Sequence, residues 1–221
     1  MAGKYTALTP ALHDYLLRHG VRADELLERL AEETRALGDI AGMQVAPEQG
    51  ALLTLLARTL GARRALELGT FTGYSAICIA RGLEPDGRLV SCDVSEEWTA
   101  VARRYLEEAG LAERVDLRLG PALDTLRELS GDEPFDLAFI DADKPSYPAY
   151  WEECLRLVRP GGLVLVDNVF AGGGIVEGSE DGFSEESAGA IRALNAQIAG
   201  DERVEHAMVP IADGLTIARV R

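Results

Sequence analysis

From Arg63 onwards the chain alternates short strand-like runs with helical stretches, and this alternation constrains the fold more than any other feature. The strand-like runs are rich in Leu, Val and Ile and fall at 64–69, 88–94, 114–120, 135–141 and 162–168. Ser95 and Ser184 each precede two glutamates, which is a typical helix start. Strands that alternate with helices predict an α/β protein whose mostly parallel sheet is covered on both faces.

The two ends of the chain differ from this pattern. Residues 1–60 are expected to be helical, because Thr9-Pro10 and Pro47 are start signals and apolar residues recur at helical spacing between them. We expect the third helix to bury a row of leucines, namely Leu52, Leu53, Leu55, Leu56 and Leu60. At the other end, runs at 204–210 and 215–221 flank Asp213-Gly214 and predict an antiparallel hairpin at the sheet edge.

One domain is expected over residues 1–221, with a helical cap region at 1–60 and an α/β core at 61–221. A length of 221 residues and 47% hydrophobic residues suffice for a core that needs no disulfide or metal. Residues 171–187 are rich in glycine and acidic side chains, and they predict a mobile surface loop.

The net charge of −15 argues against two classes of partner. Nucleic-acid affinity depends mainly on Lys and Arg that neutralise phosphates, so this charge argues against a nucleic-acid partner and against an anionic membrane surface. No apolar run reaches the roughly 18 residues that span a bilayer, and the first ten residues lack the apolar stretch of a secretory signal.

Cysteine and histidine usage indicates a reducing, cytoplasmic setting without zinc. The three cysteines are far apart and form no CxxC motif, as expected for small buried hydrophobic residues. The three histidines are scattered, whereas a zinc site needs clustered His and Cys ligands. Lysine and asparagine are rare: Lys144 is one of two lysines, and Asn168 and Asn195 are the two asparagines.

The segment after the first strand predicts a nucleoside cofactor. Ligands of open parallel sheets bind beyond the carboxyl ends of the strands. A dinucleotide fold would show GxGxxG there, but Phe71 replaces the middle glycine and Glu67 precedes Gly69. Glu67 would repel a pyrophosphate and suits an ammonium or sulfonium group, while Asp93 ends the second strand where an acid binds ribose hydroxyls. This combination fits S-adenosylmethionine better than NAD.

A second group of strand-end residues predicts a metal site. Asp141 ends the fourth strand, and Asp167 and Asn168 end the fifth. Two carboxylates and an amide oxygen form an all-oxygen set that suits Mg²⁺, with Mn²⁺ or Ca²⁺ as alternatives. The plainer explanation is that the two acids cap the following segments and that Asn168 is a turn residue.

Lys144, three residues after Asp141, is a candidate general base. An amine beside a divalent cation loses its proton more readily, whereas arginine keeps its proton at any relevant pH. This gives a physical reason for a lysine in a chain that otherwise uses arginine. The alternative is an ordinary surface lysine.

At these residues the sequence resembles a known family. The segments that carry the resemblance are MQVAPEQG at 43–50, ALELGTFTGYSA at 65–76, DADKPSYPAYW at 141–151, RPGGLVLVDNV at 159–169 and PIADGLTIARVR at 210–221. They are similar to the cation-dependent class I O-methyltransferases, the group of caffeoyl-CoA and catechol O-methyltransferases. The resemblance runs from about residue 40 to the C-terminus.

The resemblance implies a Rossmann-like, seven-stranded methyltransferase sheet with an antiparallel C-terminal edge strand, and a homodimer. It implies that cofactor-binding residues are spread along the whole core: Met43, Val45, Glu67, Gly69, Thr70, Ser75, Asp93, Ala122, Asp141, Asp143 and Tyr150. It also implies that Asp141, Asp167 and Asn168 bind the metal and that Lys144, with Asp141, is catalytic. Two features depart from the plant enzymes: Gly172 replaces a substrate-contacting asparagine, and the loop at 172–187 is this chain's own.

The expected reaction is methyl transfer from S-adenosylmethionine to a hydroxyl of a small aromatic diol. Vicinal hydroxyls could chelate the metal, which would lower a phenol pKa, and Lys144 would take the proton. One alternative acceptor is a hydroxyl of a modified tRNA base, served by an arginine patch at Arg63, Arg64, Arg103 and Arg104. Two further alternatives are a nicotinamide-dependent oxidoreductase and a non-catalytic binding module. The sequence does not name the acceptor.

Overall fold

The computed structural model describes residues 6–176 and 182–221, and its central feature is one seven-stranded sheet. The strands are β1 (Arg64–Leu68), β2 (Arg88–Asp93), β3 (Val115–Leu119), β4 (Phe135–Ile140), β5 (Val158–Asp167), β6 (Val204–Val209) and β7 (Leu215–Val220). Their order is β3-β2-β1-β4-β5-β7-β6, and β1 to β5 run parallel. The five core strands therefore lie where the sequence predicted them.

The C-terminal hairpin is confirmed, with one refinement. β7 is antiparallel to both β5 and β6, so it lies one position in from the edge, which β6 occupies. β5 also begins four residues earlier than predicted, at Val158, because Pro160 and Gly161 are accommodated within the strand. Arg159, in this early part of β5, forms an ion pair with Asp136 on β4.

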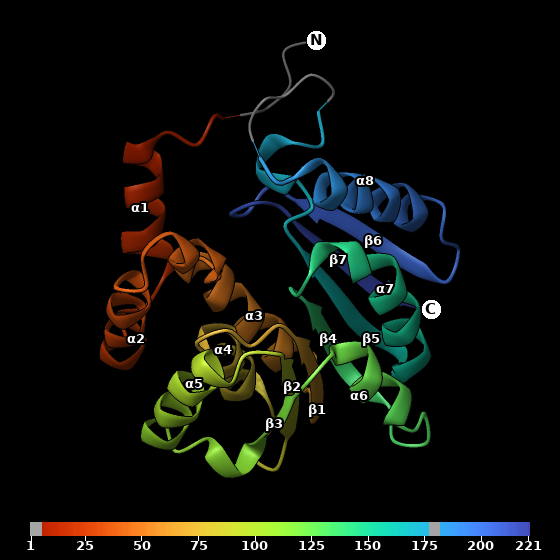
Figure 1. Cartoon of the computed structure of the whole chain (residues 1–221), viewed down its shortest axis with the longest axis horizontal. Coiled ribbons are helices and arrows are strands. Elements are labelled where there is room, and N and C mark those ends of the chain that lie inside the picture. The colour runs from red at the N-terminus through yellow and green to blue at the C-terminus, as the bar shows by residue number, and fades with distance from the viewer. Residues whose placement is uncertain (1–5, 177–181) are drawn as a thin grey trace.

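Helices cover both faces of the sheet (Figure 1). They are α1 (Pro10–Gly20), α2 (Glu25–Arg35), α3 (Pro47–Thr59), α4 (Tyr74–Gly82), α5 (Glu96–Glu108), α6 (Ala122–Glu128), α7 (Tyr147–Leu157) and α8 (Glu185–Ala199). Short 3₁₀ segments connect them: η1 (Gly38–Met43), η2 (Ala112–Arg114), η3 (Lys144–Ser146) and η4 (Ala171–Gly173).

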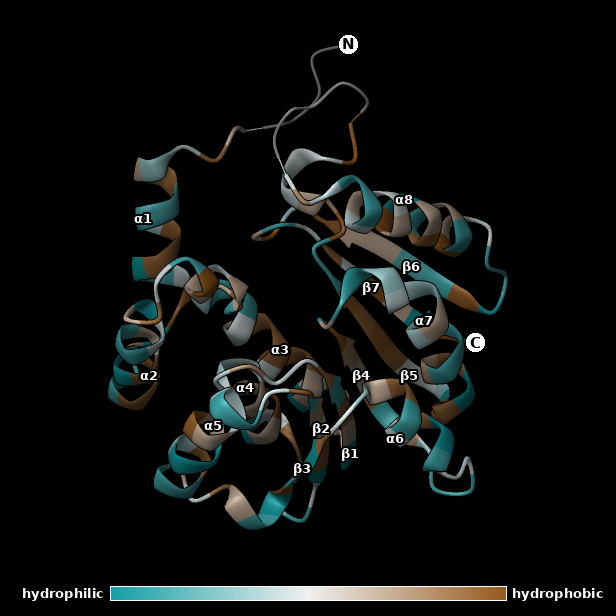
Figure 2. Cartoon of the chain, viewed as in Figure 1, coloured by the Kyte–Doolittle hydropathy of each residue, from teal (hydrophilic) through white to brown (hydrophobic). Residues whose placement is uncertain are grey.

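Two hydrophobic clusters hold these layers together. One cluster packs helices α2, α3, α4 and α5 against one face of the sheet. The other packs α6, α7 and α8 against the opposite face. Figure 2 shows the corresponding band of hydrophobic colour along the strands between the helices. The strands contribute to both clusters, as Leu66 and Leu137 illustrate, which explains why they read as nearly continuous apolar runs in the sequence.

The prediction that Leu55 is buried is wrong. Leu53 is fully buried, but Leu55 is 60% exposed and Leu52, Leu56 and Leu60 are only partly covered. A helix advances about 100° per residue, so Leu55 projects away from the side that carries Leu53. Ala57, one turn after Leu53, completes the buried stripe instead.

The glycine-rich segment predicted at 171–187 is described only in part. Residues 177–181 lie outside the described residues, and the predicted mobility stays a prediction. The described flanks approach each other, because the backbone N–H of Phe183 donates to the carbonyl of Ala171. This contact places Phe183 beside η4 and α8.

Candidate active site

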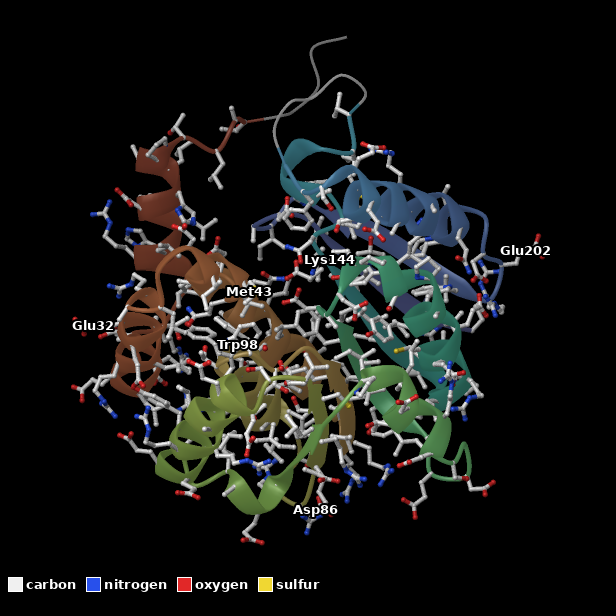
Figure 3. The ribbon with its side chains drawn as sticks, in the orientation of Figure 1. Glu32, Met43, Asp86, Trp98, Lys144 and Glu202 are labelled. Atoms are coloured by element: carbon white, nitrogen blue, oxygen red, sulfur yellow. The ribbon has the colours of Figure 1, made fainter. Side chains whose placement is uncertain are left out.

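A cavity of about 860 Å³ lies at the carboxyl ends of the strands, where β1 and β4 meet. At this point the strand order reverses, which is where open α/β sheets bind their ligands. The cavity is lined by residues predicted from the sequence to be functional: Met43, Val45, Gly69, Thr70, Ser75, Asp93, Ala122, Asp141, Asp143, Lys144, Tyr150, Asp167 and Asn168. Figure 3 shows Met43 and Lys144 on opposite sides of this central region.

Gly69 allows the ends of β1 and β4 to approach closely. Its φ is +96°, and a Cβ there would lie 2.0 Å from the carbonyl oxygen of Asp141. Only glycine fits, both for its left-handed backbone and for this contact. The glycine is therefore required to bring the cofactor loop and the Asp141 segment to the same wall of the cavity.

Asp93 fixes the loop that follows Gly69. One of its carboxylate oxygens accepts hydrogen bonds from the backbone N–H groups of Thr70 (3.0 Å) and Phe71 (2.8 Å). Its other oxygen accepts from the backbone N–H of Ser95 at 2.8 Å. A carboxylate has about four acceptor positions, so Asp93 retains capacity for the ribose hydroxyls that the sequence assigned to it.

Glu67 differs from the other predicted residues because it lies below the cavity wall. Its side chain is fully buried and accepts a hydrogen bond from the Ser91 hydroxyl, while its Oε1 has no partner among the described residues. Burial raises the pKa of Glu67 to about 7. An unpartnered buried carboxylate oxygen fits a ligand that carries an ammonium or sulfonium group.

Sequence reasoning missed the residues at the far end of the cavity. Val94 is 70% exposed, and Trp98 packs its ring edge-on against Phe71, with ring centroids 5.1 Å apart. All three line the cavity, and they offer an apolar surface for a flat base. The sequence did contain a signal for this surface, namely a tryptophan in the first turn of the helix that follows Asp93.

Asp143 is held in place by two neighbouring hydroxyl groups. The Tyr150 hydroxyl donates to one oxygen of Asp143, and the Ser146 hydroxyl donates to the other. Ser146 belongs to η3 and Tyr150 to α7, so the start of this helix orients the carboxylate. Asp143 and Tyr150, each expected from the resemblance to bind the cofactor, are thus joined by a hydrogen bond at the cavity wall.

The predicted metal ligands gather at one side of the cavity. Asp167 is 2% exposed, and burial together with the charge of Asp141 raises its pKa to about 8. Burial also raises the pKa of Asp141, against the lowering effect of Lys144. Two acids that resist ionisation together, close to an amide, form a set that a divalent cation would relieve. Magnesium therefore fits the donor chemistry of this set.

Two residues missed by sequence reasoning complete this region. Gln49, in the first turn of α3, is 1% exposed, and its amide nitrogen has no hydrogen-bond partner among the described residues. Asp213, from the turn between β6 and β7, accepts a hydrogen bond from the Asn168 amide. Among residues 6–176 and 182–221, no three His, Cys, Asp or Glu side chains form a metal cluster, so the candidate set depends on the Asn168 amide.

Lys144 lies directly beside these acids. Its Nζ donates to Asp141 at 2.9 Å and to the Tyr147 hydroxyl at 2.8 Å. The Tyr147 and Phe183 rings lie near the same amine, with centroids 4.9 Å and 5.9 Å from Nζ. Lys144 is thus a largely buried amine at the wall of the cavity, and the ordinary surface lysine of the alternative explanation does not describe it.

Comparisons with known proteins identify the family of the chain. The sequence model of the O-methyltransferase family matches residues 18–221, and the chain belongs to that family. A catechol O-methyltransferase from Niastella koreensis is 36% identical over 91% of this chain and 92% of its own length. A probable caffeoyl-CoA O-methyltransferase from Dictyostelium discoideum is 36% identical over 92% of this chain and 89% of its own length.

A solved structure extends the comparison to the cofactor. The O-methyltransferase TomG from Streptomyces achromogenes, in complex with S-adenosylmethionine, superimposes with a TM-score of 0.84 at 38% identity. The superposition covers 95% of this chain and 96% of that one. The chain is therefore an S-adenosylmethionine-dependent O-methyltransferase of the Rossmann-like fold, and the nicotinamide and non-catalytic alternatives have no support. No helix in the described part is long and apolar enough to cross a membrane.

Proposed function

We propose that this enzyme is a divalent-metal-dependent O-methyltransferase whose acceptor is a small vicinal-dihydroxy aromatic compound. The observation that carries the proposal is the gathering of Asp141, Asp167 and Asn168 beside Lys144, on the wall of the cavity that also holds the candidate cofactor residues. Mg²⁺ is the preferred ion because the three ligands offer only oxygen, and Mn²⁺ and Ca²⁺ are alternatives.

The cofactor roles follow from position in the cavity. Thr70 and Ser75, which line the cavity, would hold the methionine end together with Glu67, which lies behind the wall with one oxygen unpartnered. Asp93 would hold the ribose, and Trp98 with Ala122 the base. Met43, the last residue of η1, and Val45, two residues later, would cover the ligand. In this arrangement residues at the ends of β1 and β2 would bind S-adenosylmethionine, and Lys144 lines the same cavity.

Lys144 would act as the general base. When bound, the divalent ion would lower the pKa of an acceptor hydroxyl and hold two adjacent oxygens. Lys144 would take the proton of the reacting hydroxyl, whose oxygen would form the new bond to the methyl carbon while the carbon–sulfur bond breaks and its electron pair stays on sulfur. Asp141 holds the amine in place through its 2.9 Å hydrogen bond.

The charge of the cavity favours a small acceptor over a coenzyme A thioester. Six aspartates line the described wall, Lys144 is its sole cationic side chain, and no arginine lies there to bind phosphates. The volume of about 860 Å³ is in the range of cavities that enclose a cofactor and a small molecule. A single domain over residues 1–221, a homodimer and a cytoplasmic location complete the proposal, and they rest on the family resemblance and the composition.

A methyl-transfer assay tests this proposal. The acceptor panel contains catechols, caffeoyl derivatives and bulk tRNA, each with added Mg²⁺ or with a chelator. We expect transfer to catechols that disappears on exhaustive chelation and returns with the ion. Undiminished activity after chelation, with metal content checked, would remove the ion from the scheme.

Substitution of Lys144 tests the proton step. Lys144→Ala removes the base, and Lys144→Arg keeps the charge but cannot accept a proton at neutral pH. We expect both variants to lose about 10²–10⁴-fold in turnover while binding S-adenosylmethionine as before. Arg127→Ala, which removes an exposed cation on α6, is the matched control and should retain activity. Full turnover of Lys144→Ala near neutral pH would exclude this base.

A further inference from the structure

Asn168 is the weakest member of the candidate metal set, because its amide must present the correct end. An amide has one oxygen that can bind a cation and one nitrogen that cannot. The two ends have nearly the same shape, so the cavity wall must hold the side chain in one of two orientations. The backbone of Asn168 is fixed in the left-handed region at φ +58°, and its N–H donates to Asp167 at 2.7 Å.

Asp213 supplies the missing constraint on the side chain. The Asn168 Nδ2 donates to one oxygen of Asp213 at 3.3 Å, while the other oxygen accepts from the backbone N–H of Gly172 at 2.8 Å. A carboxylate only accepts hydrogen bonds, so it binds the nitrogen end of the amide and rejects the oxygen end. The Asn168 oxygen is consequently left for the cation.

The turn that carries Asp213 is hydrogen-bonded to the segment that directly follows Asn168. The backbone N–H of Phe170 donates to the Asp213 carbonyl at 3.0 Å, and that of Val169 donates to the Gly214 carbonyl at 3.3 Å. Gly214 has φ +81°, and a Cβ there would lie 2.8 Å from the Phe170 ring. The close packing of this turn on residues 169–172 gives the carboxylate a fixed position.

We propose that Asp213 is a positioning residue for the metal site, which orients the Asn168 amide so that its oxygen faces the cation. The inference rests on the proposed metal dependence and adds a residue from the C-terminal hairpin to it. Partners of metal ligands commonly change metal affinity about 10–100-fold when they are removed. The consequence of losing Asp213 should therefore appear in metal binding itself, before any turnover.

The test is a titration of the protein with Mn²⁺ alone, followed by the electron paramagnetic resonance signal of the free ion. Asp213→Asn keeps the size of the side chain and one acceptor for Gly172, but it places an amide nitrogen opposite the Asn168 nitrogen. We expect its affinity for Mn²⁺ to fall about 10–100-fold. Asp136→Asn is the control, because Asp136, like Asp213, accepts two hydrogen bonds but lies at the other end of the sheet; its donors are the backbone N–H groups of Arg63 (2.7 Å) and Arg64 (2.9 Å).

A donor–acceptor swap separates positioning from general support of the fold. In the double variant Asp213→Asn with Asn168→Asp, the amide at 213 donates to the carboxylate at 168, and a second carboxylate oxygen faces the ion. We expect Mn²⁺ affinity to recover, and to recover by more than Asn168→Asp gains in the otherwise unchanged chain, as a double-mutant cycle measures.

The outcomes are distinct. Asp213→Asn with unchanged Mn²⁺ affinity overturns the inference, and so does a double variant that recovers no more than the single changes predict. A parent protein that binds no Mn²⁺ overturns both this inference and the proposed metal dependence. The inference is supported when Asp213→Asn binds Mn²⁺ weakly, the swap restores binding, and Asp136→Asn binds normally.

Discussion

At the scale of single residues, the cavity and its immediate surroundings contain buried polar groups that a bound ligand would satisfy. Glu67 is fully buried with one oxygen unpartnered, and Asp167 is almost fully buried next to Asp141. Buried polar groups are normally satisfied, because an unsatisfied one destabilises the fold by about 1–3 kcal/mol. Their concentration at one end of the sheet indicates that the ligand-free fold is less stable there because these groups serve ligand binding.

Glu67→Gln is expected to stabilise the ligand-free protein at alkaline pH. The pKa of Glu67 rises from 4.5 to about 7 on folding, because burial disfavours its charged form. The folded protein therefore keeps a proton that the unfolded chain releases between these values, so its stability falls as the pH rises through this window. The neutral glutamine avoids that loss, and its advantage above about pH 7 is up to roughly 3 kcal/mol.

Urea unfolding at about pH 5 and about pH 8 measures this effect. The difference in unfolding free energy between Glu67→Gln and the parent should be larger at the higher pH. Glu128→Gln, at the exposed end of α6, is the control and should show no such growth. An advantage of Glu67→Gln that is equal at both pH values would contradict ionisation of Glu67 as its cause.

At the scale of elements, helix starts position the cavity wall. The Ser95 hydroxyl accepts a hydrogen bond from the backbone N–H of Trp98 at 3.2 Å and so caps α5. Trp98, which is labelled in Figure 3, lines the cavity. Its ring packs edge-on against Phe71. The cap thus fixes the first turn of the helix and the aromatic wall at the same time.

Ser95→Ala should therefore weaken S-adenosylmethionine binding as well as stability. Loss of a cap costs about 1 kcal/mol, and the displaced first turn moves Trp98 away from the base site. Thr9→Ala removes the cap of α1, which carries no cavity residue, and should leave cofactor affinity unchanged. Calorimetric titration with S-adenosylmethionine compares the two variants, and equal cofactor affinity in both would contradict the link between the Ser95 cap and the cofactor site.

Local signals in the sequence predicted most elements and missed contacts between distant ones. Thr9-Pro10, Pro47, Ser95 and Ser184 each mark a helix start in the structure, because a cap depends only on its neighbours. The strand ends likewise predicted the cavity-lining acids, since parallel strands finish at one edge. By contrast, Asp213 was assigned only to a turn.

Gln49 and Asp213 could not be predicted as site residues from pattern alone. Gln49 lies in the first turn of a helix before the sheet, and Asp213 in the last hairpin. Only the insertion of β7 beside β5 brings the Asp213 turn to the Asn168 segment, and strand order is not written in periodicity. Leu55 shows the same limit, because five leucines in nine residues exceed what one buried stripe can hold.

At the scale of the whole molecule, the charge distribution favours the proposed small acceptor over tRNA. The net charge is −15, but a local arginine patch could still bind phosphates. The structure pairs most of that patch with acids: Arg63 with Asp86, Arg64 with Glu133 and Arg104 with Glu33. Exposed pairs of this kind contribute little stability, yet they cancel the positive potential that would attract a polyanion.

We therefore expect no retention of bulk tRNA by the protein in filter binding, even at about 20 mM salt, where phosphate contacts are strongest. Asp86→Asn combined with Glu133→Gln would free Arg63 and Arg64, and it tests whether pairing rather than net charge suppresses binding. Salt-sensitive retention by this double variant alone would attribute the suppression to the pairs. Salt-sensitive retention by the parent chain would instead make the tRNA hydroxyl a candidate acceptor again. Such retention would require a cationic surface that the paired arginines do not provide.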